Sequence, residues 1–174
     1  MFIDNNIQIP WGCELRVDNI TSEDARLLKK AGCQLVATGI ESASLEVLRN
    51  NLKYQIPEYV IRGIKNLKYK DIPIQAYFVL GLPGETEKTF QDTLEFIKKL
   101  PLNNLDTINY FVATPYPGSR LWEDRTTFEI KILEEDFSKY DCQHIIFETK
   151  DLNLSTLKIL YKTAVKIESY FKSS

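Results

Sequence analysis

The order of hydrophobic and polar positions along the chain predicts alternating strands and helices. Four runs rich in apolar and β-branched residues are predicted as strands, at 11–17, 34–40, 72–80 and 107–113. The run at 72–80 is apolar almost throughout, which is typical of a parallel strand that is buried on both faces. Strands that alternate with helices in this way predict an α/β fold with a parallel sheet and right-handed crossovers.

Apolar residues at helical spacing occupy the segments between these strands. Helices are expected from the cap Ser22 to Gly32, at 44–49, from Pro57 to Leu67, and from the cap Thr86 to Pro101. A last helix is expected at 155–171. The segment 123–149 has mixed character, with a short strand predicted at 144–147.

Four strand–helix units are too few to close a parallel barrel, so we expect either an open, doubly wound sheet or one arc of a barrel. In parallel sheets, ligand sites form where the strands end, because the variable loops gather at that edge. This edge brings together Arg16 and Asp18, Glu41 and Ser42, Gly81 to Glu85, and Thr114 to Ser119. Polar groups from four strands therefore converge, as a site for a polar organic ligand requires.

Each of these groups allows a structural and a functional interpretation. Glu41 and Ser42 can cap the following helix, or the Glu41 carboxylate can accept two hydroxyl hydrogen bonds from a ribose diol. Arg16 can hold a ligand carboxylate or simply pair with a neighbouring acid. In Gly81-Leu82-Pro83-Gly84-Glu85, the two glycines permit close approach to a flat ligand, or the segment is only a tight connection.

Composition narrows the classes of function. With 22 basic and 24 acidic side chains, the formal net charge of -2 does not favour binding to nucleic acid or to an anionic membrane. No apolar run approaches the roughly 20 residues that span a bilayer, and the first residues do not resemble a signal peptide. We therefore expect a cytoplasmic protein with a single domain over 1–174.

The spacing of the cysteines predicts neither a disulfide framework nor a short metal-ligand motif. Cys13, Cys33 and Cys142 lie far apart in the sequence and are expected to be buried free thiols. His144 is the only histidine, and we expect a structural or surface role for it.

Five segments, taken in order, resemble the radical S-adenosylmethionine (SAM) superfamily. They are Trp11-Gly12-Cys13-Glu14-Leu15-Arg16-Val17-Asp18, Ala31-Gly32-Cys33, Gly39-Ile40-Glu41-Ser42, Gly81-Leu82-Pro83-Gly84-Glu85-Thr86 and Pro115-Tyr116-Pro117-Gly118-Ser119. The likeness is greatest to the subgroup that often carries a cobalamin-binding domain, and to its methylthiotransferase-like relatives. It implies a partial parallel (β/α) barrel over 11–122, with about four βα units of a six-strand barrel. The extension over 123–174 would end in a helix.

The resemblance also implies roles for residues at the carboxyl ends of the strands. Glu41 and Ser42 would contact the ribose of SAM or nearby polar groups, and Arg16 would lie near the methionine end. The adenine would pack against the backbone of Gly81, Leu82, Pro83, Gly84 and Glu85. The adenine pocket would be closed in part by the loop from Pro115 to Ser119, which includes Tyr116.

The chain departs from the family pattern at the iron–sulfur centre. It has no CxxxCxxC loop, which in the family binds the [4Fe-4S] cluster that cleaves SAM, and the first two strands of the barrel are missing. We therefore expect the C-terminal, SAM-binding and substrate-facing portion of such an enzyme, which lacks cluster ligands and is inactive alone. Its partner would be the missing half of the barrel, or a second copy paired through an exposed strand edge.

Two other interpretations stay open at this point. The chain could be a non-catalytic α/β binding or scaffold protein that retains the same fold. An unrelated enzyme of aldolase or phosphosugar type would need a lysine at a strand end or a metal-binding set, and neither is evident.

Overall fold

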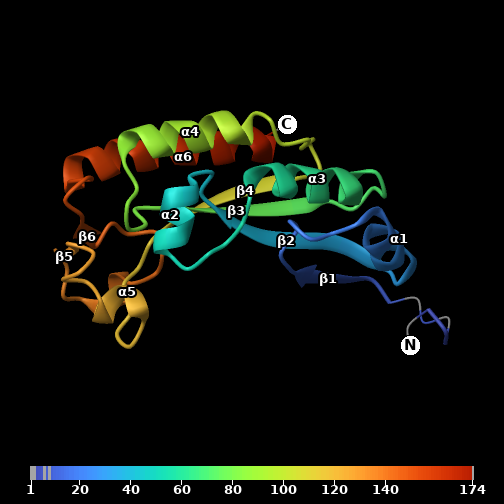
Figure 1. The fold of residues 1–174 in the computed structure, drawn as a ribbon, viewed down its shortest axis with the longest axis horizontal. Helices are drawn as coiled ribbons and strands as arrows, with labels where there is room; N and C mark the ends of the chain where they lie inside the picture. The colour runs from blue at the N-terminus through green and yellow to red at the C-terminus, as the bar shows by residue number, and fades with distance from the viewer. Residues whose placement is uncertain (1–2, 6, 8, 174) are drawn as a thin grey trace.

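A parallel sheet of four strands forms the centre of the computed structural model, which describes residues 3–5, 7 and 9–173 (Figure 1). The strands lie in chain order: β1 (Trp11–Glu14), β2 (Cys33–Glu41), β3 (Ile74–Leu80) and β4 (Thr107–Val112). The connections contain α1 (Ser22–Lys30), then α2 (Leu45–Asn50) with α3 (Pro57–Lys68), and α4 (Glu87–Ile97). Because all three ladders are parallel, every strand of this sheet ends at the same edge.

The chain after β4 forms a separate small layer and then returns along the sheet. It contains α5 (Arg120–Glu123), a two-stranded antiparallel sheet of β5 (Lys131–Ile132) and β6 (Phe147–Glu148), and the 3-10 helix η1 (Phe137–Lys139). The long helix α6 (Leu154–Ser173) then packs beside α4 and β4 (Figure 1).

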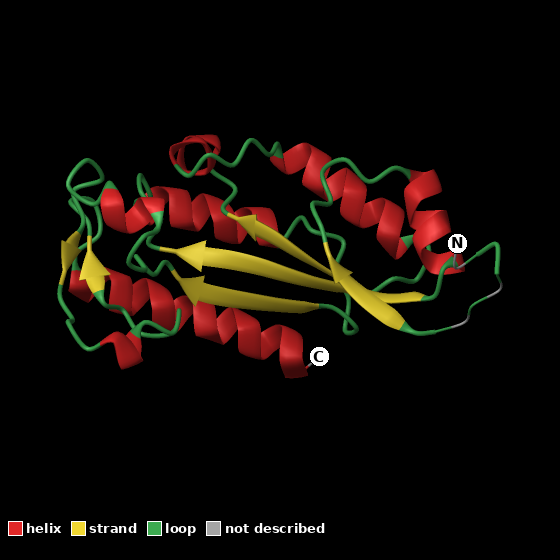
Figure 2. Cartoon of the chain, turned by 90° about the horizontal axis from the view of Figure 1, so that it is seen from below, coloured by secondary structure: helices red, strands yellow, loops and turns green. Residues whose placement is uncertain are grey.

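The longer helices α1, α3, α4 and α6 cover only one face of the four-stranded sheet. Figure 2 looks onto the other face, and no helix lies in front of the strands. Along β3, Ile74, Ala76, Phe78 and Leu80 are buried toward the helices, whereas Gln75, Tyr77 and Val79 are half-buried on the other side. A doubly wound sheet carries helices on both faces, so the structure selects the arc of a barrel.

The prediction that 72–80 is buried on both faces is therefore wrong for one face. We call this side the open face, because no helix of the described chain covers it. An apolar strand is compatible with the inside of a closed barrel as well as with a sheet that helices cover on both faces, since the interior of a barrel is filled by side chains.

The hydrophobic core lies between the helices and the sheet. Phe78 stacks on Tyr110 with 5.3 Å between ring centroids, and Phe90 of α4 lies 6.0 Å from the same ring. A second buried cluster joins the end of β4 to the layer that follows it, through Val112, Ala113, Ile130, Tyr140, Ile146 and Phe147. The extension after β4 is thus packed onto the edge where the strands end.

The two outer edges of the sheet differ in their hydrogen bonding. On β4, the outward N–H of Tyr110 donates to the Glu168 carboxylate of α6, and that of Val112 donates to the Cys142 carbonyl at 2.7 Å. On β1, the Leu15 N–H donates inward to Ala37 at 3.0 Å, so the N–H of Glu14 points outward. Glu14 is exposed, and no described residue accepts from its N–H. One edge is closed and the other is open.

The predicted elements are found with shifted boundaries. Thr21, and not Ser22, caps α1, because the Thr21 hydroxyl accepts from the Asp24 N–H at 3.1 Å while the Asp24 carboxylate accepts from the Thr21 N–H. The first strand ends at Glu14 rather than Val17, and the strand predicted at 144–147 is the shorter β6. Within the described residues, no helix has the length and apolar character needed to cross a bilayer. The cytoplasmic location stays a prediction.

Asp106 fastens the starts of β3 and β4 to the end of α3. Its carboxylate is fully buried and accepts from Lys68 Nζ at 2.7 Å. It also accepts from the backbone N–H groups of Ile74 and Asn103, both at 2.7 Å. A single side chain thus satisfies one cation and two backbone donors.

Replacing Asp106 by alanine is expected to lower the free energy of unfolding by about 3–5 kcal/mol, because it leaves a mostly buried ammonium group without its partner. Urea denaturation measures this loss. The matched control is Asp92→Ala, which breaks an exposed pair with Lys88 at 2.9 Å and should cost less than about 1 kcal/mol. Equal losses for the two variants would contradict the assignment.

Candidate functional site

Arg16 lies just beyond the end of β1 and makes a two-pronged contact with Asp18. Its Nε donates to Oδ1 at 3.2 Å and its Nη2 to Oδ2 at 2.7 Å, and Nη2 also donates to the Tyr54 carbonyl at 2.7 Å. Arg16 therefore pairs with a neighbouring acid, which is the structural alternative left open above. The proposed position near the methionine end of SAM stays a prediction.

Glu41 ends β2 and forms an ion pair with Lys53. The Lys53 Nζ donates to Glu41 Oε1 at 2.8 Å and to the Gly39 carbonyl at 2.6 Å. A Cβ at residue 39 would lie 2.3 Å from Glu41 Oε1, so glycine at this position allows the pair to lie against the strand. The backbone of Glu41 itself has a left-handed φ of 66°, which is uncommon for a residue with a side chain.

The helix after β2 is capped by neither Glu41 nor Ser42. Ser44 caps α2 by accepting from the Val47 N–H, so the capping interpretation is wrong. Ser42 is 1% exposed, and its Oγ accepts from the Ser44 N–H at 3.1 Å and lies 3.3 Å from Thr93 Oγ1 on α4. Ser42 thus joins the end of β2 to the helix layer, and its contact with SAM stays a prediction.

The segment from Gly81 to Glu85, which we call the glycine turn, reverses the chain between β3 and α4. Gly81 and Gly84 both have a φ of 85°, in the left-handed region that favours glycine. The Glu85 N–H closes the turn by donating to the Leu82 carbonyl at 2.9 Å. The predicted sharp turn is confirmed, whereas its contact with adenine stays a prediction.

Two neighbouring layers hold the glycine turn from opposite sides. From α2, the side-chain amide nitrogens of Asn50 and Asn51 each donate to the Pro83 carbonyl at 3.4 Å. From the extension, the Phe147 ring fills the space beside Gly81, where an added Cβ would lie 3.2 Å from Phe147 Cζ. The shape of the turn therefore depends on parts of the chain far from it in sequence.

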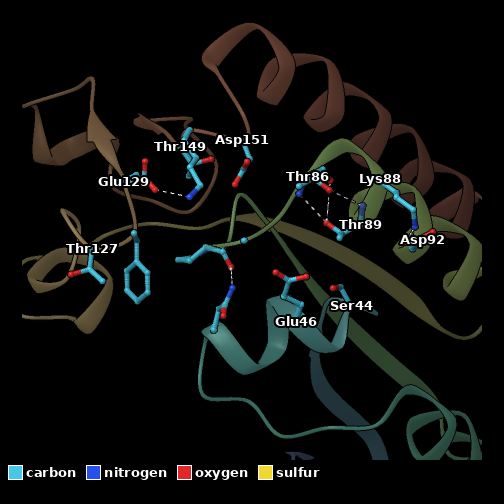
Figure 3. Close-up of a pocket in the computed structure, with 15 residues that line it drawn as sticks. Ser44, Glu46, Thr86, Lys88, Thr89, Asp92, Thr127, Glu129, Thr149 and Asp151 are labelled. Atoms are coloured by element: carbon cyan, nitrogen blue, oxygen red, sulfur yellow. Dashed lines mark hydrogen bonds and ion pairs between the residues drawn. The ribbon is translucent and has the colours of Figure 1, made fainter.

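The glycine turn lies between two hollows. The first, which we call the Glu41 pocket, has a volume of about 450 Å³ and is lined by Glu41, Lys53, Val79, Leu82, Arg120 and Phe128, among others. Its walls are largely apolar, with the Glu41–Lys53 pair and Arg120 as its charged groups. The second, the α2–α4 cleft, has about 820 Å³ and lies against Pro83 and Gly84. Figure 3 shows Glu46 of α2, the α4 cap Thr86, and Asp151 of the extension around the cleft.

Most residues of the Glu41 pocket were not predicted from the sequence, and Lys53, Arg120 and Phe128 are examples. Lys53 and Phe128 lie in connections without a periodic pattern, and Arg120 follows a proline-rich loop. Arg120 Nη1 donates to the Asn50 carbonyl at 3.0 Å, and its guanidinium lies 5.0 Å from the centroid of the Phe128 ring. No motif marks these residues, because tertiary packing alone brings them to the pocket.

Pro115 and Tyr116 do not line the Glu41 pocket. Pro115 is buried after β4, while Tyr116 is 43% exposed with its hydroxyl 3.3 Å from Cys142 Sγ. The hydrogen bond with the Cys142 thiol raises the pKa of Tyr116 to about 12. The role of this loop in closing an adenine pocket stays a prediction.

The three cysteines do not form the ligand set of an iron–sulfur cluster. Cys13 and Cys33 lie close together on the first two strands, where burial raises the pKa of Cys13 to about 11. Cys142 lies beside β4 at the opposite edge of the sheet. All three are free, as expected, although only Cys33 is fully buried. Among the residues that the structure describes, no group of three or more Cys, His, Asp or Glu side chains is placed to hold a metal ion.

Comparison with known proteins identifies the family. The family model of the radical SAM superfamily matches residues 7–97. The chain belongs to the radical SAM superfamily. An uncharacterized methyltransferase of Pyrococcus horikoshii is 36% identical over 117 residues, which are 67% of this chain and 25% of that protein. The bacteriochlorophyllide d C-12(1)-methyltransferase of Chlorobaculum tepidum is 29% identical over 147 residues, which are 83% of this chain and 31% of that protein.

Solved structures of other proteins have a similar fold. The archaeal Elp3 of Methanocaldococcus infernus superposes with a TM-score of 0.62 at 17% identity, over 91% of this chain and 42% of that one. The radical SAM methyltransferase TsrM of Kitasatospora setae, solved with tryptophan and a SAM analogue, superposes with a TM-score of 0.60 at 16% identity. The match covers 96% of this chain and 36% of that one. The predicted fold, an arc of the radical SAM barrel with a C-terminal helix, is confirmed. The chain spans about a quarter to a third of the two curated relatives.

Replacing Gly81 by alanine tests the packing of the extension against the glycine turn. Both a strained backbone and the contact with Phe147 oppose the new methyl group, so the free energy of unfolding should fall by about 2–4 kcal/mol in urea denaturation. Gly118→Ala is the matched control, because Gly118 has a φ of 83° but nothing within 4 Å of an added Cβ. The control should lose only about 1–2 kcal/mol. Equal losses would mean that Phe147 does not press on the turn.

Proposed function

We propose that this chain provides the SAM-binding and substrate-facing arc of a radical SAM enzyme. The observation that supports the proposal is the Glu41–Lys53 ion pair beside the apolar side chains of Val79 and Leu82, in a pocket at the edge where the strands end. A ligand that combines a flat base, a ribose diol and a carboxylate matches this combination of groups.

Each group of the Glu41 pocket suits one part of SAM. The carboxylate of Glu41 can accept from the two ribose hydroxyls, since an ionised carboxylate has free lone pairs beyond the one used by Lys53. The ammonium of Lys53, with 19% of its side chain exposed, has a third N–H to offer to the ligand carboxylate. Leu82 and Val79 provide an apolar wall for the adenine. When bound, a [4Fe-4S] cluster supplies the electron that cleaves SAM, and we assign its ligands to a part of the enzyme outside this chain.

Methyl transfer is the reaction that we propose for the complete enzyme. Two relatives, at 36% and 29% identity, carry the name methyltransferase. A purely structural role of the same fold is the alternative, and SAM binding distinguishes the two.

The open edge of β1 is where we propose that the rest of the barrel pairs. The outward N–H of Glu14 is an unused donor, whereas the corresponding groups of β4 are occupied by α6 and by the extension. A strand from the cluster-binding half, on the same polypeptide or on another one, would continue the sheet in the parallel direction. This pairing would occupy the unused backbone groups along the edge of β1.

Glu14→Pro tests the open edge, because proline removes the outward N–H and leaves the inward hydrogen bonds of β1 to β2 intact. The isolated wild-type chain is expected to self-associate with rising concentration in sedimentation experiments, and the proline variant is expected to stay monomeric. Glu14→Gln is the matched control and should associate like the wild type. A monomeric wild-type chain, or a proline variant that still associates, would contradict the proposal.

Anaerobic reconstitution of the isolated chain with iron and sulfide tests the missing cluster ligands. We expect no absorption of a [4Fe-4S] cluster, because the three cysteines do not converge. A bound cluster would overturn the assignment of its ligands to another part of the enzyme.

Calorimetry with SAM tests the Glu41 pocket in the complete, cluster-containing protein. Lys53→Met and Glu41→Gln should each weaken SAM binding by about tenfold or more, because each removes a charge-assisted hydrogen bond. Glu58→Gln, on the exposed side of α3, is the control and should bind SAM like the wild type. Unchanged affinity in both pocket variants would favour the structural alternative.

A further inference from the structure

Glu85 is an acidic residue in an unusual position, at the end of the glycine turn and almost completely buried. It is 2% exposed, and the Gly81 N–H donates to its Oε2 at 2.5 Å. This hydrogen bond links the first and last residues of the turn through a side chain. No lysine or arginine among the described residues forms an ion pair with Glu85.

Among the described residues, only the Gly81 N–H donates to the Glu85 carboxyl group. Tyr110 of β4 has a buried hydroxyl without a hydrogen-bond partner, and Glu168 of α6 brings a second carboxylate to the backbone of Tyr110. The pKa of Tyr110 is raised above its usual range, mainly by burial and to a smaller extent by the charges of Glu85 and Glu168. At the start of α4, Thr86 and Thr89 already satisfy each other's N–H groups, so these donors are not available to Glu85.

We propose that Glu85 is a positioning residue whose side chain latches the glycine turn into the shape that receives the adenine of SAM. This inference rests on the proposed function and extends it to a residue that does not line the Glu41 pocket. Leu82 lines that pocket and lies between the two latched residues, Gly81 and Glu85. A turn that opens would therefore displace the apolar wall of the pocket.

The latch works as a neutral carboxylic acid. Burial raises the pKa of Glu85 to about 8, and the hydrogen bond from Gly81 lowers it only in part. The carbonyl oxygen of a neutral acid still accepts the Gly81 N–H, more weakly than a carboxylate does, and it leaves no charge buried beside the ring of Tyr110. Glutamine at this position keeps the same acceptor and should replace Glu85, whereas alanine removes it.

The sign of the pH dependence follows from the raised pKa. Between about pH 4.5 and 8 the folded chain keeps a proton that the unfolded chain releases, so stability falls as the pH rises through this range. In urea denaturation, the free energy of unfolding of the wild-type chain should fall relative to that of Glu85→Gln between pH 5 and pH 8. Parallel curves for the two proteins would show that Glu85 is charged throughout and would overturn the neutral latch.

Hydrogen exchange of the Gly81 amide tests the latch directly and does not depend on SAM. Glu85→Ala should lose protection of this amide by about tenfold or more, while Glu85→Gln keeps most of it. Glu87→Gln, an exposed carboxylate in the first turn of α4, is the matched control and should exchange like the wild type. Unchanged protection in the alanine variant, or equal losses in the alanine and glutamine variants, would overturn the proposal.

SAM affinity of the complete enzyme separates failure of the latch from failure of the proposed function. If Glu85→Ala loses both amide protection and SAM affinity, and Glu85→Gln keeps both, the inference is supported. Lost protection with unchanged SAM affinity would overturn the link to SAM while the latch itself stands. Circular dichroism of each variant verifies that the fold is retained.

Discussion

Parallel pairing of four consecutive strands is the constraint on which the rest of the structure depends. Because every strand points in the same direction, each connection must cross back over the sheet, and each strand end reaches the same edge. The Glu41–Lys53 pair, the glycine turn and Arg16 therefore lie at one edge although up to 69 residues separate the first from the last. The parallel pairing of the strands therefore determines where the candidate site lies in the fold, whichever side chains line it.

The sheet is buried on one face by helices, and its other face is open. The helices supply a continuous apolar layer, with Phe90 of α4 packed against the rings of Phe78 and Tyr110. On the other face, where Gln75 and Tyr77 are half-buried, no helix of the described chain covers the sheet. In a barrel of such strands, the face opposite the helices is the interior.

The extension after β4 makes the site depend on distant parts of the chain. Phe147 fills the space that Gly81 leaves, and Arg120 reaches the Asn50 carbonyl of α2. The same extension supplies hydrogen-bond partners to the outer edge of β4. It therefore holds the glycine turn and closes one edge of the sheet, while β1 stays open for pairing.

The sequence by itself determined the strands, the helices and the family. Periodic apolar spacing fixes which segments cross the sheet, and short glycine-containing motifs mark backbone shapes that few other residues adopt. The choice between a doubly wound sheet and a barrel arc was left to the tertiary structure, since both use the same strand pattern. Only the fold could reveal Lys53 beside Glu41 and the burial of Glu85. Those features depend on which parts of the chain meet in three dimensions, and local periodicity carries no information about that.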